Sequence, residues 1–562
     1  MKKIAVRPFL ALIAVCFGCN ADERRAQTTF NRDIAPIVFE HCAACHRPEG
    51  SAPFSLLDYA DVIARAEQIA FVTQSRYMPP WKPKRGYGHF VGERGLTDEQ
   101  IKTIQRWIDE GEQEGPAADL PPRPQWESDW ELGPPDLVSP MPVAYTLNAD
   151  GPDVFRNFVI PLPVDETRYI KAVEFKPENA RIVHHATMMI DRSGAARRKD
   201  ELDDEPGFEG MSFGEAQDAD GHFLGWTQGK TPYAGSDSLA WRLEQGTDLL
   251  LQLHMLPTGK AEPIQSRVGL FFADGPPKRR PAMLRLGRKD IDIPAGASDY
   301  RIRDIYKLPV DVEVLTIYPH AHYLGAETKA YAELPDGREQ GLIWIEDWDF
   351  NWQDDYRFQE PVFLPAGTTL VMEYSYDNSA KNSRNPHDPP LRVRYGLHSA
   401  DEMGDLTLQV LPRRASDLPQ LKRDFYRKWM LQEIDGYKML IAAEPTDWDT
   451  HHTLAMFYLG SNQRALAFTE FELALEHNPD YVEARVNYGI ALAQDKKLDR
   501  AVNHLKEALR RQPDFVQAHF NLGIALYMLG RSEEAQPHLD EVVRQRPAMA
   551  EGIERRLQQL RR

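Results

Sequence analysis

Two kinds of side-chain cluster in this chain of 562 residues could carry metal or cofactor chemistry. The first is a pair of cysteines followed directly by a histidine, in Cys42-Ala-Ala-Cys45-His46. The second is a set of histidines between residues 184 and 322, of which two are adjacent and two are separated by a single residue. Thiolates and imidazoles are ligands for soft and borderline metal ions, so both clusters indicate redox or metal chemistry.

The spacing Cys-x-x-Cys-His is typical of covalent haem c attachment. Cys42 and Cys45 can form thioethers with the two haem vinyl groups, and His46 then becomes the proximal iron ligand. We expect Met78 to be the distal ligand, because it is the only methionine between residues 2 and 140 and lies in a Pro-Pro loop rather than a core segment. The alternatives are a zinc half-site, a lone disulfide, a bis-histidine haem and a packing role for Met78.

The histidines of the second cluster that we consider as ligands occur in segments that are expected to be strands. His320 and His322 are two residues apart, so on one strand both imidazoles project from the same face and can share a metal ion. His184 and His185 are adjacent, and joint ligation requires a β-bulge or the use of different ring nitrogens. His254 ends an alternating strand whose leucines are expected to pack inward.

The elements around these histidines are predicted to be short strands. Residues 136–412 alternate β-type runs, such as 312–318 and 391–395, with turns rich in Gly, Pro and Asp. We therefore expect two all-β sandwiches of jelly-roll type, over 136–277 and 278–412.

The N-terminal segment has the pattern of a secretory signal. Basic residues precede the apolar run 9–18, which is too short to span a bilayer as a mature helix. Cleavage after Ala21 and lipidation of Cys19 both fit, so the chain is expected to be periplasmic or extracytoplasmic, with a membrane anchor in the second case. A buried N-terminal helix is the alternative.

The predicted domains follow from these segments and from a proline-rich stretch. Residues 22–115 resemble a monohaem cytochrome c domain and are expected to form a small all-α fold, closed by a helix that Thr97 caps together with Gln100. Residues 116–135 are read as a linker between this domain and the β domains.

The C-terminal part repeats with a fixed period. Prolines occur at positions 445, 479, 513 and 547, an interval of 34 residues that is typical of tetratricopeptide repeats. Residues 413–445 are expected to be a linker and leading helix, and 446–562 an α-solenoid that could hold a protein partner. The adjacent His451 and His452 diverge on a helix, so we do not expect them to be ligands.

Charge and cysteine content exclude several classes. The chain has 67 basic and 85 acidic side chains, a net charge of −18, which argues against nucleic-acid binding. All four cysteines lie in the first 45 residues, so the β domains can have neither disulfides nor cysteine ligands. Cupredoxins and copper nitrite reductases are excluded, since their coppers require cysteine.

The order and neighbourhoods of the histidines in residues 140–412 resemble those of the copper type II, ascorbate-dependent monooxygenases, the peptidylglycine α-hydroxylating and dopamine β-hydroxylating class. The resemblance implies two copper ions, the first for electron transfer and the second for O₂ activation. The matching ligands of the first copper are His184, His185 and His254, and those of the second are His320, His322 and Met403. Met372 competes as the sulfur ligand, but the Asp-Glu-Met context of residues 401–403 favours Met403.

The resemblance implies an enzyme that hydroxylates a C–H bond of a small-molecule or peptide substrate with O₂. This chain departs from the animal members of the class because its β domains lack disulfides, and because an attached haem c could supply the electrons in place of ascorbate, itself reduced by an external donor. Two rival interpretations remain. One is a non-enzymatic electron-transfer or copper-handling scaffold with a protein-binding repeat domain, and the other is a zinc hydrolase.

Overall fold

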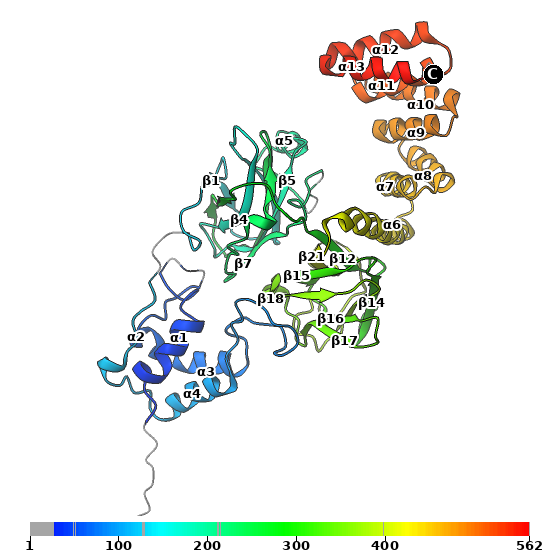
Figure 1. Cartoon of the computed structure of the whole chain (residues 1–562). Helices are drawn as coiled ribbons and strands as arrows, with labels where there is room; N and C mark the ends of the chain where they lie inside the picture. The colour runs from blue at the N-terminus through cyan, green and yellow to red at the C-terminus, as the bar shows by residue number, and fades with distance from the viewer. Residues whose placement is uncertain are drawn as a thin grey trace, which may run out of the picture. The chain divides into compact units, whose positions relative to one another are not determined.

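The computed structural model describes residues 27–560, apart from Glu49, Ser51, residues 126–129, Met211, Ser212, Gly214 and Leu397. The predicted signal peptide, with Cys19, lies outside these residues. The chain forms two compact units (Figure 1). The first comprises the residues up to Trp81 together with Arg94–Gln125, and the second comprises Lys82–Glu93 together with Trp126–Arg562.

The described residues of the first unit contain helices and no strand. The helices are η1 (Phe30–Ile34), α1 (Ala35–His41), α2 (Tyr59–Ile63), α3 (Ala66–Gln74), α4 (Asp98–Asp109) and η2 (Ala117–Asp119). Thr97 and Gln100 form the predicted capping box at the start of α4. Phe30 and Trp107 are buried in its core.

The second unit contains two sheets over residues 137–272, whose neighbouring strands are antiparallel. One sheet has the order β1 (Leu137–Pro140), β11 (Arg267–Phe272), β4 (Arg168–Lys176) and β8 (Trp241–Leu243). The other has the order β6 (Phe208–Glu209), β3 (Val154–Pro161), β9 (Asp248–Met255), β5 (Val183–Asp191) and β7 (Leu224–Thr227). The strands β2 (Tyr145–Leu147) and β10 (Glu262–Ile264) form a separate pair, and α5 (Ala195–Asp200) and η3 (Asp237–Leu239) lie in connections.

Alternation along the strands builds the core of this first β region. Leu249, Leu251 and Leu253 of β9 are buried between the two sheets, as expected from the sequence. On the other face of the same strand, Gln252 donates a hydrogen bond to the Asn157 side chain at 3.1 Å. His254 shares the face of Gln252, so the strand presents it away from the core.

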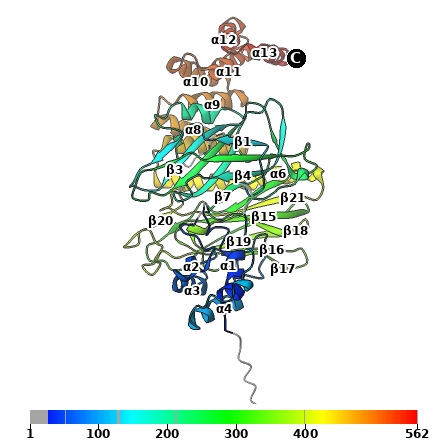
Figure 2. The same cartoon turned by 90° about the vertical axis from the view of Figure 1, so that its left-hand side faces the viewer.

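A second pair of four-stranded sheets spans residues 282–412. One has the order β12 (Ala282–Gly287), β21 (Gly404–Pro412), β15 (Val312–Ala321) and β18 (Tyr356–Leu364) (Figure 1), of which β21, β15 and β18 lie side by side in Figure 2. The other has the order β14 (Tyr300–Lys307), β19 (Thr369–Tyr376), β16 (Gly325–Glu333) and β17 (Glu339–Ile345). The strand predicted over 391–395 is reduced to β20 (Val393–Arg394), paired with β13 (Asp292–Ile293), and η4 (Phe350–Trp352) lies between β17 and β18.

Helical hairpins make up the C-terminal part. After η5 (Ala415–Asp417) the helices are α6 (Leu418–Ala443), α7 (Trp448–Gly460), α8 (Arg464–His477), α9 (Val482–Gln494), α10 (Leu498–Arg511), α11 (Val516–Met528), α12 (Ser532–Gln545), η6 (Pro547–Met549) and α13 (Ala550–Leu560) (Figure 1). Gly489 and Gly523 occupy equivalent positions of α9 and α11, where a Cβ atom would meet Leu505 or Leu539 of the paired helix. The predicted small residues therefore allow the close approach of each helix pair.

The prediction of a multidomain chain, with a β-rich region followed by an all-α repeat region, is confirmed. One boundary differs from the expectation, because Lys82–Glu93 was predicted within the first domain but belongs to the second unit. Among the described residues, no helix is both long and apolar enough to cross a bilayer.

Candidate metal centre

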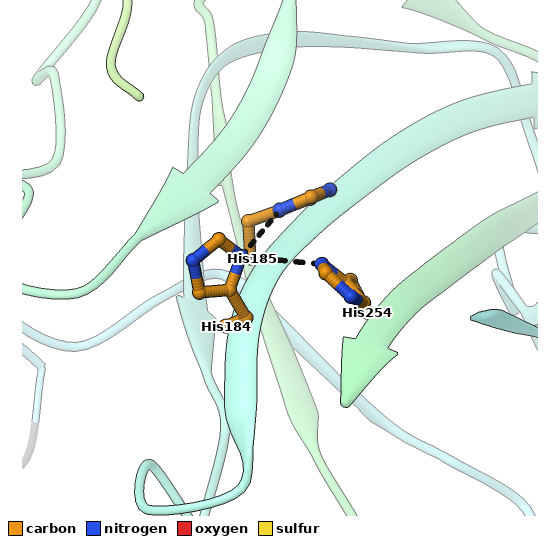
Figure 3. A group of neighbouring side chains, drawn as sticks. All are labelled: His184, His185 and His254. Carbon is orange, nitrogen blue, oxygen red and sulfur yellow. Dashed lines mark hydrogen bonds between the residues drawn. The ribbon is translucent and has the colours of Figure 1, made fainter. Parts of the chain in front are cut away.

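Three histidines from two neighbouring strands converge on one point (Figure 3). The Nδ1 atom of His184 lies 3.1 Å from Nδ1 of His185 and 3.1 Å from Nδ1 of His254. One ligand atom from each of the three rings lies within 4.8 Å of the others. Within the described part of the chain, they are the one such group of three or more His, Cys, Asp or Glu side chains.

A β-bulge allows the adjacent His184 and His185 to project toward the same point. In the ladder between β5 and β9, Val183 pairs with Met255 and His185 pairs with His254, so His184 is an extra residue on β5. A regular strand would point the two neighbouring side chains to opposite faces, whereas the bulge turns both toward His254. The expectation of a bulge is confirmed.

The orientation of the His254 ring is fixed on both sides. Its Nε2–H group donates to Oδ2 of Asp153 at 2.7 Å, so in the neutral imidazole the lone pair is on Nδ1, which faces His184. The ring of Phe155 stacks on His254 with a centroid distance of 4.0 Å and an interplanar angle of 8°. Asp153 also accepts a hydrogen bond from the hydroxyl of Ser399 at 2.9 Å.

The cluster has the donor set and dimensions of a metal site. Burial and the neighbouring imidazoles lower the pKa of His184 to about 4 and the pKa of His185 well below its usual value, so both rings are neutral at pH 7. A neutral His184 ring can carry at most one hydrogen on Nδ1, so hydrogen bonding alone cannot satisfy both 3.1 Å contacts of this atom. Metal–nitrogen bonds of about 2.0 Å at tetrahedral angles hold donor atoms about 3.3 Å apart, which fits these contacts.

A second pair of histidines lies at the end of β15. The ring centroids of His320 and His322 are 5.2 Å apart, and the ring planes are nearly perpendicular at 86°. His320 donates from Nδ1 to the side-chain oxygen of Gln353, and His322 donates from Nδ1 to the Asp401 carbonyl at 3.1 Å. Both rings therefore keep Nε2 for a ligand, the opposite nitrogen from the first cluster. Burial lowers the pKa of His320 to about 4 and that of His322 to about 3, so they too are neutral.

Met403 is expected to lie on the same face of the sheet as His320. In the ladder between β15 and β21, His320 pairs with Asp405 and Ala321 pairs with Gly404. A Cβ atom on Gly404 would meet the Tyr376 hydroxyl and Ile302, which belong to the opposite sheet, so position 404 faces the interior. Asp405 therefore faces the other way, as its partner His320 does, and we expect the same of Met403, which directly precedes β21.

Met372 is in a different environment. It is a fully buried residue of β19 and pairs with Ala330 and Asp304 in the other sheet. Tyr374 and Tyr376 donate hydrogen bonds from the same strand to carbonyls on β21 or directly before it, and Met372 shares their face by the period of two. Met372 is thus directed into the interior of the sandwich, on the far side of the sheet from His320.

The buried carboxyl group of Glu402 connects the methionine segment to the histidine segment. Glu402 accepts hydrogen bonds from the backbone N–H groups of His322, of Leu324 at 3.0 Å and of Met403 at 2.8 Å. Burial raises the pKa of Glu402 to about 8. Glu402, the central residue of the Asp-Glu-Met segment, therefore binds the backbone of both Met403 and His322 and keeps these two residues close together.

One aromatic ring contacts both groups of histidines. Phe350 of η4 is 3% exposed, and its ring lies 5.5 Å from the ring of His184 and 5.5 Å from the ring of His322. Gln353 follows three residues later and donates to the Phe350 carbonyl at 3.0 Å, which directs its amide oxygen toward His320. The segment 347–353, named here the bridging loop, thus contacts both candidate metal sites.

The Cys-x-x-Cys-His segment follows α1 as a helical turn. The backbone N–H groups of Cys45 and His46 both donate to the Cys42 carbonyl, at 3.2 and 2.9 Å. His46 donates from Nδ1 to the Phe54 carbonyl at 3.2 Å, which leaves Nε2 for an iron atom. Cys42 and Cys45 are free thiols, as thioether formation requires. Met78 is half-buried after α3, with its N–H bonded to the Val72 carbonyl at 3.0 Å. These residues fit the attachment of haem c.

Sequence patterns did not reveal several residues that position the site. Asp153 precedes β3 without any motif, and Phe350 and Gln353 lie in an irregular connection. Their importance follows only from the packing of the two β regions, which brings residues 153, 184 and 350 together. No hydrophobic period along the sequence predicts such a contact. One sequence feature could have pointed to Glu402, because it is the middle residue of the Asp-Glu-Met segment.

The comparisons with known proteins concern the repeat region. The tetratricopeptide repeat family matches residues 497–550, which confirms the predicted repeats. Repeats of this kind stack into solenoids with a concave surface that binds proteins or peptides. A search of curated proteins finds no match.

The similar solved structures also match only a limited part of this chain. A crystal structure of MamA protein is 18% identical, covers 21% of this chain and 64% of its own, and has a TM-score of 0.20. A crystal structure of YrrB, described as a tetratricopeptide repeat protein with an unusual peptide-binding site, is 23% identical, covers 22% of this chain and 63% of its own, and has a TM-score of 0.21. This chain therefore spans less than two thirds of either protein.

Proposed function

We propose that this protein is an exported dicopper monooxygenase with a covalently attached haem c. It would hydroxylate a C–H bond of an organic substrate. The overall reaction consumes R–H, O₂, two electrons and two protons, and yields R–OH and water. The electrons would come from an external donor, and a haem held by Cys42, Cys45 and His46 would pass them to a copper ion held by histidine alone.

The observation that carries this proposal is the difference between the two histidine groups. His184, His185 and His254 bring three Nδ1 atoms together, a set that suits a copper ion exchanging single electrons. His320 and His322 keep Nε2, and we expect Met403 on their face of the sheet. A thioether favours Cu(I), the oxidation state that reacts with O₂, and is a poor ligand for zinc. A redox pair is therefore favoured over a zinc hydrolase.

Copper supplies the redox chemistry when bound, and the side chains of this chain supply its environment. Asp153, Gln353 and the Asp401 carbonyl each hold one imidazole in a fixed orientation. Phe350 is a buried apolar contact of both groups of histidines. The haem proposal rests on Cys42, Cys45 and His46, with Met78 as the second iron ligand.

The repeat region and the N-terminal segment add a partner and a location. Tetratricopeptide repeats support a protein or peptide partner, which could be the substrate itself or an assembly factor. Haem c attachment occurs outside the cytoplasm, so we propose a periplasmic or extracytoplasmic location, with Cys19 as a lipid anchor.

Copper loading combined with oxygen uptake tests the proposal. The full-length protein should bind two copper ions and consume O₂ when an excess of reductant and a panel of C–H substrates are supplied. Hydroxylated product should carry ¹⁸O from labelled O₂. If the copper-loaded protein transfers electrons but consumes no O₂ with any substrate, the electron-transfer or copper-handling scaffold is the better description.

A further inference from the structure

The segment Lys82–Glu93, named here the strap, packs on the C-terminal pair of sheets. It begins four residues after Met78 in the sequence and interrupts the first unit, yet it belongs to the second. The backbone N–H of Lys84 donates to the Trp344 carbonyl at 2.7 Å, and that of Val91 donates to the Arg357 carbonyl at 2.8 Å. Gln359 returns a bond to the His89 carbonyl at 2.9 Å. The strap is therefore paired with β17 and β18 as an added edge.

Buried aromatic contacts hold the strap in place. Phe90 is 2% exposed, and its ring lies 4.9 Å from Phe358 and 5.4 Å from Tyr356. Tyr87 packs against Trp344 at 5.5 Å and covers Gly341, where a Cβ atom would come within 2.7 Å of the Tyr87 ring. Burial of the Phe90 ring and the partial burial of the Tyr87 ring together make a sizeable apolar contribution, so the strap is an integral part of this sandwich.

The beginning of the strap is paired with the bridging loop. Nζ of Lys82 lies 3.1 Å from Oδ2 of Asp347 and 3.8 Å from Oδ2 of Asp349. The side chains of Lys82 and Asp349 are only 11% and 7% exposed, so the charges interact with little screening by solvent. Asp349 caps η4, whose first residue is Phe350.

These contacts form a continuous path of packed groups. It runs from Lys82 through Asp349 to Phe350, whose ring stacks on His184 at 5.5 Å. The same loop holds His320 through Gln353. The strap thus connects the chain directly after Trp81 with the residues that orient both groups of histidines.

We propose that the strap and the bridging loop are the electron entry route from the haem domain to the copper at His184, His185 and His254. This inference rests on the proposed function. In each transfer the ferrous haem loses one electron and becomes ferric, while Cu(II) gains it and becomes Cu(I). The external donor then reduces the haem again, and a second transfer supplies the second electron of the cycle. The strap is a positioning element, since it touches neither metal.

A larger side chain at Gly341, behind the Tyr87 ring, tests this route without mutating a residue of the strap or a histidine. We call this substitution the wedge variant. Gly341→Val puts methyl groups where the Tyr87 ring now lies, and Gly275→Val is the matched control because a Cβ atom there meets nothing within 4 Å. In the wedge variant, amide exchange at Lys84 and Val91 should rise. Stopped-flow reoxidation of the ferrous haem by the Cu(II)-loaded protein should slow about tenfold, with haem absorbance and copper content unchanged.

A second variant covers the case in which the wedge disturbs the sheet. Lys82→Gln shortens the side chain by one atom and removes the charge that pairs with Asp347 and Asp349, and Lys381→Gln is its exposed control. Haem reoxidation should slow in Lys82→Gln alone. If the wild type transfers electrons and both strap variants match its rate, the route is wrong while the proposed function stands. If the wild-type haem transfers no electron to copper, the proposed function fails and the route with it.

Discussion

Asp153 accepts a hydrogen bond from Nε2 of His254 at 2.7 Å, while Nδ1 of the same ring lies 3.1 Å from Nδ1 of His184. The carboxylate thus selects the tautomer of a histidine that is fully buried. Ser399 donates to the same carboxylate and stands four residues before Met403. One acidic side chain therefore links the first histidine cluster to the segment that carries the sulfur of the second.

Removal of this carboxylate should weaken the first copper. Asp153→Ala frees the His254 ring to rotate, and we expect the affinity for Cu(I) to fall about 10- to 100-fold in a competition titration with a chromogenic chelator. Asp150→Ala, an exposed aspartate three residues earlier, is the control. Equal affinities of the two variants would contradict the role assigned to Asp153.

Copper stoichiometry should separate the two groups of histidines. His184→Ala removes the Nδ1 atom that contacts both neighbours, and His320→Ala removes a ligand at the other group. Each variant should bind one copper ion in place of two, as measured by elemental analysis after dialysis. Retention of two copper ions by either variant would mean that the removed ring is not a ligand.

The sulfur ligand should be Met403. Met403→Leu and Met372→Leu are near volume-conserving changes, so both proteins should fold. In X-ray absorption spectra of the Cu(I) protein, we expect the sulfur scatterer to disappear in Met403→Leu and to remain in Met372→Leu, because residue 372 is directed into the interior of the sandwich. The reverse result would show that Met372 is the ligand.

Covalent haem should depend on both thiols. Cys42→Ala leaves one thiol for thioether formation, and we expect the mature protein to carry less haem, with a shifted pyridine haemochrome band. Ser55→Ala in the same unit is a control outside the motif. A full complement of haem with an unshifted band in Cys42→Ala would rule out attachment at this cysteine.

The stability of the repeats should depend on their interhelical glycines. Gly489→Ala brings a Cβ atom to 2.8 Å from Cγ of Leu505, and such overpacking typically costs about 1–3 kcal/mol. Gly552→Ala in α13 meets nothing within 4 Å and should stabilise its helix by up to about 1 kcal/mol. In thermal melts followed by far-ultraviolet circular dichroism, the melting temperature of the helical transition should fall in Gly489→Ala. It should not fall in Gly552→Ala.

Local patterns predicted those features that are encoded by neighbouring residues. The capping box at Thr97, the 34-residue repeat and the inward leucines of β9 all follow from spacing along the chain. The bulge at His184 could be anticipated for the same reason, because two adjacent ligands cannot project from one face of a regular strand.

Contacts between distant segments were beyond such patterns. Asp153 and Phe350 approach the histidines only after two separate pairs of sheets have formed, and nothing in their own neighbourhoods marks them. The strap was missed for a related reason. Its alternation is weak and its partners, Trp344 and Phe358, lie more than 250 residues away in the sequence.

The course of the strap has a consequence for inheritance. Because Lys82–Glu93 belongs to the second unit and is flanked in the sequence by two parts of the first, the units are interleaved along the gene. No single recombination point exchanges one unit and leaves the other whole. The first unit and the β regions of the second are therefore expected to diverge as one heritable block, whereas the repeats after residue 445 can be replaced by a single crossover.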